Sequence, residues 1–258
     1  MSTLLKAIVR EKIGTKNKIF VLCSSSNNLK QFVQLFSASA HRPKGLMLGV
    51  YEPAEEGGQF LLTPTGQKVN ERFSGKLQSV LKNATRKLKC GSSRVLFGID
   101  DGQYTSIAVA NLGKQDVDFD EEEQIYQGKE NIRAAVASAV LLLRDAGETA
   151  VDVDTCGDAQ AAAEASLLAL HSFDELRQEK DRKPAVDVNL LMTGKEKGSP
   201  ENNWTRGEIL AKAQNFARYL MESPANKMTP TIFSEAIEAT KDRKKWRTMI
   251  ANAVKQGT

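Results

Sequence analysis

Several features of secreted, membrane and metal-binding proteins are scarce in this sequence. Aromatic residues make up 6% of its 258 residues, and it contains two histidines and three cysteines. Cys23, Cys90 and Cys156 lie far apart and form no CxxC pair. This pattern does not indicate a disulfide framework and favours a protein of a reducing compartment. Apolar runs such as AVLLL, residues 139–143, are far shorter than the ~20 residues of a membrane-spanning helix.

Motifs that carry catalysis are also missing. His41 lies in a basic stretch and His171 in an Ala/Leu-rich one, where a structural role is favoured, and neither belongs to an HExxH motif. There is no GxSxG, no Walker-type phosphate loop and no GxGxxG after a strand. Residues 152–164 start like a calcium loop, but Cys156 and Ala163 occupy positions that need oxygen ligands. We therefore assign no catalytic, cofactor-binding or metal-binding residue.

The charge is unevenly distributed, although the net charge is only +4. Residues 1–44 contain eight Lys or Arg against one acid, Glu11, and residues 241–258 are basic too, which leaves the middle acidic on balance. Basic ends occur in proteins that bind nucleic acids or anionic membranes, and also in poorly ordered tails, which we favour here. The Ser-rich, acid-poor residues 1–43 have the composition of a mitochondrial transit segment, with an uncleaved basic leader as the alternative.

Strands and helices alternate from residue 44 onward. Strands are predicted at residues 45–51, 59–64, 94–99, 105–113, 149–156 and 185–192. Helices are predicted at residues 70–87, 130–147 and 157–176, and the acidic stretch 116–123 is predicted to be a solvated loop. The second helix has one apolar face, formed by Ile132, Ala135, Val136, Ala139, Val140 and Leu143, and Gly147 as its C-terminal cap. This alternation predicts a layered α/β fold.

A polar break at residues 194–203 precedes a helical C-terminal part. A Thr205–Glu208 capping box predicts a helix that ends before Pro224. Thr229 and Pro230 then begin another helix. The first helix has an apolar stripe of Ile209, Ala213, Phe216 and Leu220, and the basic end could extend the second through Trp246, Ile250 and Val254. We expect part of these apolar faces to be exposed unless the helices fold back on the preceding domain.

Four segments resemble one family. They are KGLMLGVY (44–51), GKENIRAAVA (128–137), VDVDTCGDAQAAAE (151–164) and AQNFARYLMESPANKMTPTIFSEAIE (213–238). In this order they are similar to the N-terminal half of the leucyl aminopeptidases, in particular the animal cytosol aminopeptidases. The resemblance implies a macro-domain-like α/β domain with a mixed sheet flanked by helices, followed by a long linker helix and a C-terminal helix. It divides the chain into a leader (1–43), this domain (44–194), a linker (195–240) and a divergent basic tail (241–258).

The family's chemistry belongs to its other half. The resemblance implies a hexameric enzyme whose C-terminal domain binds two divalent metal ions, which are zinc, manganese or magnesium. These ions activate a water molecule that attacks the N-terminal peptide bond of the substrate. The family's metal ligands, catalytic lysine and arginine, and signature NTDAEGRL have no matching position here. We therefore expect no cofactor in this chain and no peptidase activity, as for a truncated isoform or paralogue or a gene-model artefact.

The remaining roles are binding and assembly. Association with full-length aminopeptidase subunits is the expected partnership, and a macro-like module for a nucleotide or ADP-ribose, or a structural subunit, is the alternative. We expect no specific nucleic acid and no membrane span. The expected location is the cytoplasm, with mitochondria as the alternative if the leader is a transit segment.

Overall fold

The computed structural model of the protein describes residues 8–13, 16–21, 44–53, 58–84, 88–99, 103–115, 117, 119–192 and 199–241. It contains two units, residues 1–42 and residues 43–258. In the first unit, β1 (Ile8–Ile13) pairs antiparallel with β2 (Lys16–Val21), a hairpin that the sequence did not predict. The rest of the leader, and the stripe of Trp246, Ile250 and Val254, lie outside the described residues.

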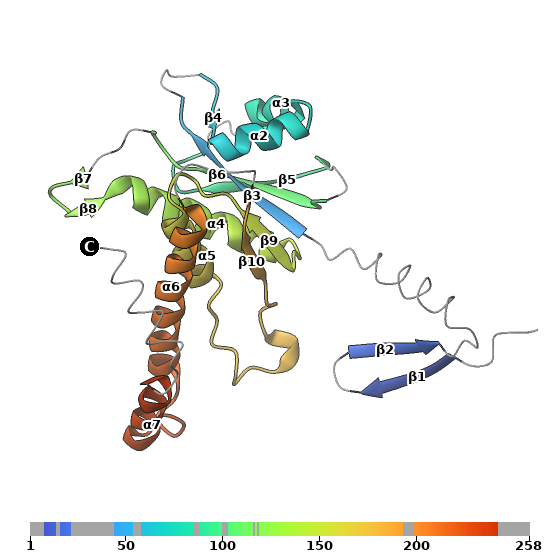
Figure 1. The fold of residues 1–258 in the computed structure, drawn as a ribbon, viewed down its shortest axis with the longest axis vertical. Helices are drawn as coiled ribbons and strands as arrows, with labels where there is room; N and C mark the ends of the chain where they lie inside the picture. Colours follow the sequence, from blue (N-terminus) through green and yellow to red (C-terminus); the bar gives the residue numbers. More distant parts are fainter. Residues whose placement is uncertain are drawn as a thin grey trace, which may run out of the picture. The chain divides into compact units, whose positions relative to one another are not determined.

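The second unit is built on a mixed sheet (Figure 1). Its strands lie in the order β10 (Asp187–Leu190), β9 (Ala150–Val153), β3 (Lys44–Tyr51), β6 (Ser106–Asn111) and β5 (Ser93–Phe97), and β4 (Leu61–Leu62) pairs with β3. The first four strands of this order run parallel, and β5 and β4 are antiparallel to their neighbours. All six residues of β6 are buried, as is usual for strands covered on both faces.

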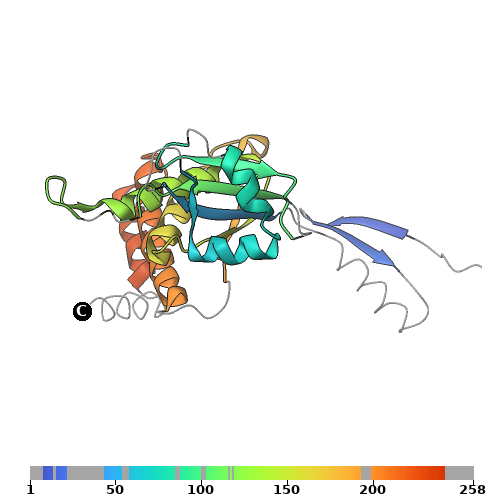
Figure 2. The same ribbon diagram turned by 90° about the horizontal axis from the view of Figure 1, so that it is seen from above.

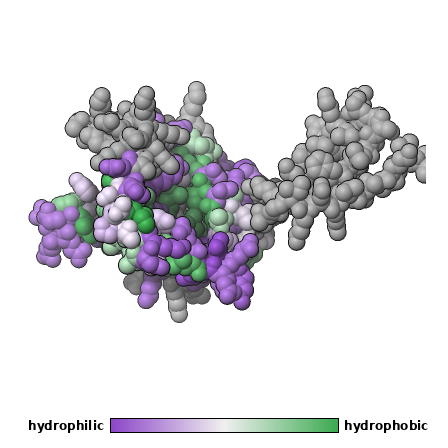
Figure 3. All heavy atoms as spheres, turned by 90° about the horizontal axis from the view of Figure 1, so that it is seen from below, coloured by the Kyte–Doolittle hydropathy of each residue, from purple (hydrophilic) through white to green (hydrophobic). Residues whose placement is uncertain are grey.

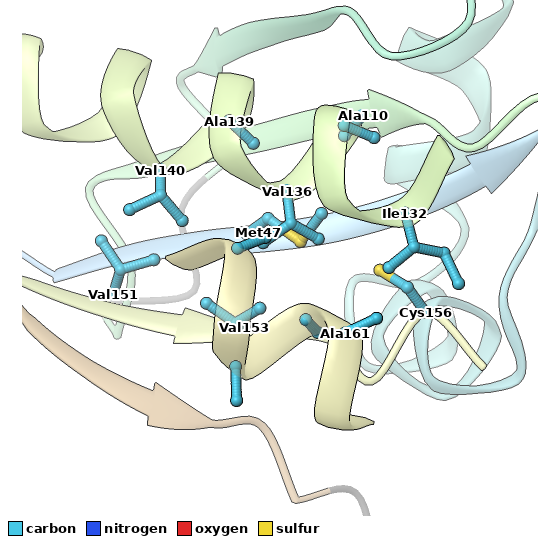
Figure 4. Packing of buried hydrophobic residues seen from close by; sticks show 14 of the residues in the cluster. Met47, Ala110, Ile132, Val136, Ala139, Val140, Val151, Val153, Cys156 and Ala161 are labelled. Atoms are coloured by element: carbon cyan, nitrogen blue, oxygen red, sulfur yellow. The ribbon is translucent and has the colours of Figure 1, made fainter. Parts of the chain in front are cut away.

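Helices cover both faces of this sheet. Because side chains alternate along a strand, Met47 of β3 packs on one side, and its neighbours Leu46 and Leu48 pack on the other. The Met47 side contacts α4 (Gln127–Asp145) and α5 (Ala159–Ala169), with Val151 of β9 in the same core (Figure 4). The opposite side contacts α2 (Pro64–Arg72) and α3 (Lys76–Ala84). The layered α/β fold predicted from the sequence is therefore confirmed.

Helix α4 also has the predicted face. All six apolar residues named for it are buried, and Gly147 follows its end with φ of 94°. This left-handed conformation has no steric penalty in glycine and lets the chain turn back into β9.

The predicted helix over 70–87 is two helices. Ser74 and Gly75 have positive φ values of 53° and 77° between α2 and α3. Left-handed residues break the hydrogen-bond pattern of an α-helix, so the chain turns at this point. Helix α2 also begins before the predicted stretch, where the Thr63 hydroxyl accepts a hydrogen bond from the Gly66 amide at 3.0 Å. Phe73, Leu77 and Leu81 are buried at helical spacing, whereas Val80 is exposed. Such spacing predicts helix but does not record a break in the backbone.

The acidic stretch contains a strand that the sequence did not predict. β7 (Phe119–Asp120) pairs antiparallel with β8 (Ile125–Tyr126), which leads directly into α4. The rings of Phe119 and Tyr126 are 4.9 Å apart between centroids and meet edge to face. Such a cross-strand aromatic pair stabilises a hairpin.

Helix α6 (Pro200–Glu222) starts ahead of its predicted capping box. The Thr205 hydroxyl donates to the Glu201 carbonyl at 2.8 Å, and Glu208 accepts a bond from Trp204 Nε1 at 3.0 Å. Both are contacts within the helix, and proline at its first position explains the earlier start. The prediction for the other end is confirmed, because α6 stops before Pro224 and α7 (Pro230–Lys241) follows Thr229. Helix α5, in contrast, ends at Ala169 and is shorter than the helix predicted over residues 157–176.

Candidate functional site

The connections of the sheet point to one edge. From β3 the chain reaches β6 on one side of β3, and from β6 it crosses through α4 to β9 on the other side. Open α/β sheets bind ligands at the carboxyl ends of the strands where the direction of winding reverses. In this chain that place lies after Val153, where the segment 154–158 joins β9 to α5.

Asp154 occupies this place and is completely buried. Its Oδ2 accepts hydrogen bonds from the Gly49 amide at 3.1 Å and from the Thr63 hydroxyl. Its Oδ1 accepts one from the Cys156 amide at 3.2 Å. One carboxylate therefore connects β3, the start of α2 and the turn after β9.

Burial sets the chemistry of this turn. Burial raises the pKa of the Asp154 carboxyl, and the hydrogen bonds from Thr63, Gly49 and Cys156 act in the opposite direction. Burial also raises the pKa of the Cys156 thiol well above its usual value, with Asp154 adding to the effect. A thiol of raised pKa is a poor nucleophile, because the thiolate is the reactive form.

Tyr51, at the end of β3, contacts the same turn. Its hydroxyl donates to the Cys156 carbonyl at 3.2 Å, and burial, together with Cys156 and Asp154, raises its pKa to about 12. Cys156 has a positive φ of 53° and Gly157 one of 88°. The bond from Tyr51 therefore holds a turn of unusual backbone conformation. We infer a structural role for these contacts, because each hydrogen bond joins two parts of the fold.

The second carboxylate of the calcium-like segment is engaged elsewhere. Asp152 Oδ2 accepts a bond from the Tyr104 hydroxyl at 2.7 Å and pairs with Lys44 Nζ at 2.7 Å. Asp158 accepts from the Ala161 amide at 3.0 Å and so caps α5. Among the residues that the structure describes, no group of three or more His, Cys, Asp or Glu is arranged to hold a metal ion.

His171 and Cys90, the histidine and the other cysteine that the structure describes, have different surroundings. His171 Nε2 lies 3.1 Å from Glu222 Oε2, at the end of α6. Cys90 is exposed, and partial burial and the nearby Glu52 raise the pKa of its thiol. His41 and Cys23 lie outside the described residues.

A second feature is the joint between α5 and α6, which the sequence did not reveal. A Cβ atom on Gly207 would lie 2.5 Å from the Gln160 carbonyl oxygen and 2.8 Å from the Ala163 Cβ, so only glycine fits where the helices cross. Further along, Asn215 donates to the Leu167 carbonyl and Arg218 to the Leu168 carbonyl, both at 2.9 Å. These bonds satisfy carbonyls at the C-terminal end of α5. A glycine inside a helical pattern was the available signal.

The far end of this helical part is less covered. Ile209 and Leu220 are buried, whereas Met221 is 85% exposed and Phe233 of α7 is 46% exposed. Seen from below, apolar areas of the unit are bordered by hydrophilic residues (Figure 3). In the predicted stripe of α6, Phe216 is half-buried and Ala213 is exposed, so the fold-back holds for only part of that face. The expected exposure around α7 holds for Phe233, whereas Ile237 is half-buried. No helix among the described residues has the length and apolar character to cross a membrane.

Comparison with known proteins identifies the family to which this domain is related. The model of the cytosol aminopeptidase family N-terminal domain matches residues 47–180. The chain is 42% identical over 201 residues to the cytosol aminopeptidase of Bos taurus, and 39% identical over 210 residues to that of Homo sapiens. The two alignments cover 78% and 81% of this chain but 37% and 39% of the relatives. The chain thus spans less than half of the length of these curated relatives.

Solved structures support the fold. A mutant tomato leucine aminopeptidase matches with a TM-score of 0.53 and 15% identity, over 79% of this chain and 40% of that one. The bottromycin maturation enzyme BotP matches with a TM-score of 0.50 and 18% identity, over 77% of this chain and 37% of that one. The resemblance seen in the sequence is confirmed: the chain belongs to the cytosol aminopeptidase family through its N-terminal domain.

Proposed function

We propose that this chain serves as the non-catalytic N-terminal part of a leucyl aminopeptidase. Residues 44–194 would form the domain and residues 195–240 the linker, and peptide hydrolysis would need a metal-binding half of the kind implied by the family. The observation that supports this most is the use of Asp154, whose carboxylate takes up amide and hydroxyl donors from three segments of the fold. Asp154 lies where a ligand would bind, and its hydrogen bonds give it a structural role.

The role that we propose for the chain itself is assembly with other subunits. Helix α6 is fixed to α5 through the Gly207 contact and the bonds of Arg218, so it leaves the domain in a defined direction. Complete aminopeptidase subunits are the partners we propose, and the cytoplasm is the location, since the curated relatives are named cytosol aminopeptidases. A helix held in this way suits a connector whose far end presents Met221 and Phe233 for packing.

A ligand-binding module is the weaker alternative. At the edge of the sheet where a nucleotide would bind, the chain places the buried carboxyl group of Asp154. Because this group is completely buried, it offers no surface on which a phosphate could be bound. The contacts of that group with Thr63 and Gly49 further commit the edge to packing.

Metal titration tests the proposal. Isothermal calorimetry of the purified chain with manganese or magnesium ions should show no saturable binding, because the family's metal ligands are implied to lie in the other half. A complete cytosol aminopeptidase, stripped of metal, is the positive control. Saturable binding of two ions per chain would overturn the proposal.

A further inference from the structure

One buried carboxylate has an oxygen atom without a partner in the described part of the chain. Glu148 lies between α4 and β9 and is only 4% exposed. Its Oε1 accepts hydrogen bonds from the hydroxyl groups of Thr105 and Ser106, both at 2.6 Å. Its Oε2 is buried and has no hydrogen-bond partner among the described residues. Such an atom calls for an explanation, because a polar group buried without a partner destabilises the fold.

Glu148 lies at the edge of the sheet opposite to Asp154. Figures 1 and 2 show α4 running back across the sheet from the β7–β8 hairpin, so its end lies where β3 and β6 begin. The Glu148 amide donates to the Leu143 carbonyl of α4 at 3.1 Å. The carbonyl end of a helix carries partial negative charge, which favours a cation close to it. We call this side of the sheet, where the parallel strands begin, the starting edge.

Further oxygen atoms accompany the Glu148 carboxylate at the starting edge. The hydroxyl oxygen of Thr105 lies 3.3 Å from the Lys44 carbonyl oxygen, which also accepts a bond from the Thr105 amide at 3.0 Å. Together with Ser106, this gathers oxygen atoms of one carboxylate, two hydroxyl groups and one main-chain carbonyl. Hydroxyl oxygens that donate their protons keep lone pairs with which they can contact a cation.

The negative charge of Glu148 has no counter-charge among the described residues. None of the ion pairs in this part of the chain includes Glu148. Lys44, at the same edge, pairs instead with Asp152 at 2.7 Å, and Arg144, at the end of α4, pairs with Asp145 at 2.9 Å. Fully buried glutamates are almost always paired, so the starting edge is suited to receive a positive charge.

We propose that the starting edge binds one monovalent cation, sodium or potassium, through the carboxylate of Glu148. Hard cations take oxygen ligands such as carboxylates and carbonyl groups, and the oxygen atoms of Thr105, Ser106 and Lys44 lie beside this carboxylate. A single carboxylate is balanced by a single positive charge, which favours a monovalent ion over a divalent one. The bound ion stabilises the folded chain, because it compensates a buried charge.

Thermal unfolding of the full chain at constant ionic strength tests the proposal. N-methylglucamine chloride at about 150 mM is replaced stepwise by sodium chloride or potassium chloride, so that only the size of the cation changes. The midpoint temperature should rise saturably by about 2–4 °C with at least one of the two small cations, because a ligand that binds only the folded state stabilises it. The same midpoint in all three salts would overturn the proposal.

Variants assign the effect to the site. Glu148→Gln keeps the shape of the side chain and removes its charge, so the response to small cations should disappear. Ser106→Ala retains the charge and removes one hydroxyl group, so about threefold more cation should be needed for half of the effect. Glu164→Gln is the matched control, because it removes another buried carboxylate, which already pairs with Arg133 at 2.7 Å. It should respond to the small cations as wild type does.

Two results with these variants would contradict a cation at Glu148. One is a response to small cations that persists in Glu148→Gln. The other is a difference in midpoint between wild type and Glu148→Gln that changes with pH and not with sodium or potassium, since a proton would then neutralise the carboxylate. The measurement involves neither divalent ions nor peptide substrates, so its outcome is independent of the proposed non-catalytic role.

Discussion

The hydroxyl group of Thr63 donates a hydrogen bond to the buried carboxylate of Asp154, which lies 91 positions later in the sequence. The same hydroxyl accepts from the Gly66 amide at 3.0 Å, so Thr63 both caps α2 and attaches it to the end of β9. A side chain with two such roles should matter more than an ordinary cap.

Replacing Thr63 with Val keeps its shape and removes both hydrogen bonds. We expect the free energy of unfolding to fall by about 1–3 kcal/mol, because a buried acceptor and a helix N–H lose their partner. Urea unfolding followed by circular dichroism measures the change. Ser79→Ala is the control, since its hydroxyl makes one exposed bond to the Lys76 carbonyl. Equal effects of the two substitutions would contradict the assigned role of Thr63.

Asp154→Asn should reveal the raised pKa of this carboxyl through pH. The unfolded chain releases the Asp154 proton near pH ~3.9, whereas the folded chain retains it to a higher pH because burial raises the pKa. The folded state then binds more protons in this window, so wild-type stability falls as pH rises. The stability advantage of wild type over the variant should therefore shrink above pH ~4. Urea unfolding at several pH values would refute this if the advantage grew instead.

Gly207→Ala should destabilise the protein, although alanine is the better helix former. At an open helix position this change stabilises by roughly 0.5–1 kcal/mol. Here the new methyl group would lie 2.5 Å from a backbone carbonyl oxygen of α5, so we expect a loss of about 1–3 kcal/mol from overpacking. Thermal unfolding decides by the sign of the change. A more stable variant would mean that α6 does not cross α5 this closely.

The particular contacts show what sequence patterns could and could not predict. The buried face of α4 followed from local periodicity, because residues three and four apart in a helix share one side. The break at Ser74 and Gly75 and the early start of α6 depend on backbone conformation and caps, which periodicity does not record. The Gly207 crossing and the Thr63–Asp154 bond join segments far apart in sequence, so no local pattern contained them. Gly207 could at most be noted as an unexplained glycine within a helix.

Titration with ADP-ribose should give no binding heat. At the edge of the sheet that such a ligand would use, the carboxyl group of Asp154 is completely buried and already bonded to Gly49 and Thr63. Isothermal calorimetry with the purified chain measures this, and Asp154→Asn is a useful companion because it replaces the carboxyl group with a neutral amide of similar shape. Saturable, salt-resistant binding to wild type would favour the ligand-binding alternative.

Hydrolysis of a leucyl anilide tests the central claim most directly. The purified chain, supplied with manganese or zinc ions, should release no more aniline product than buffer containing the same metal. The cytosol aminopeptidase of a curated relative, assayed alongside, shows that the conditions support turnover. Metal-dependent release that stays with the chain through further purification, after contaminating peptidases are removed, would contradict a non-catalytic role.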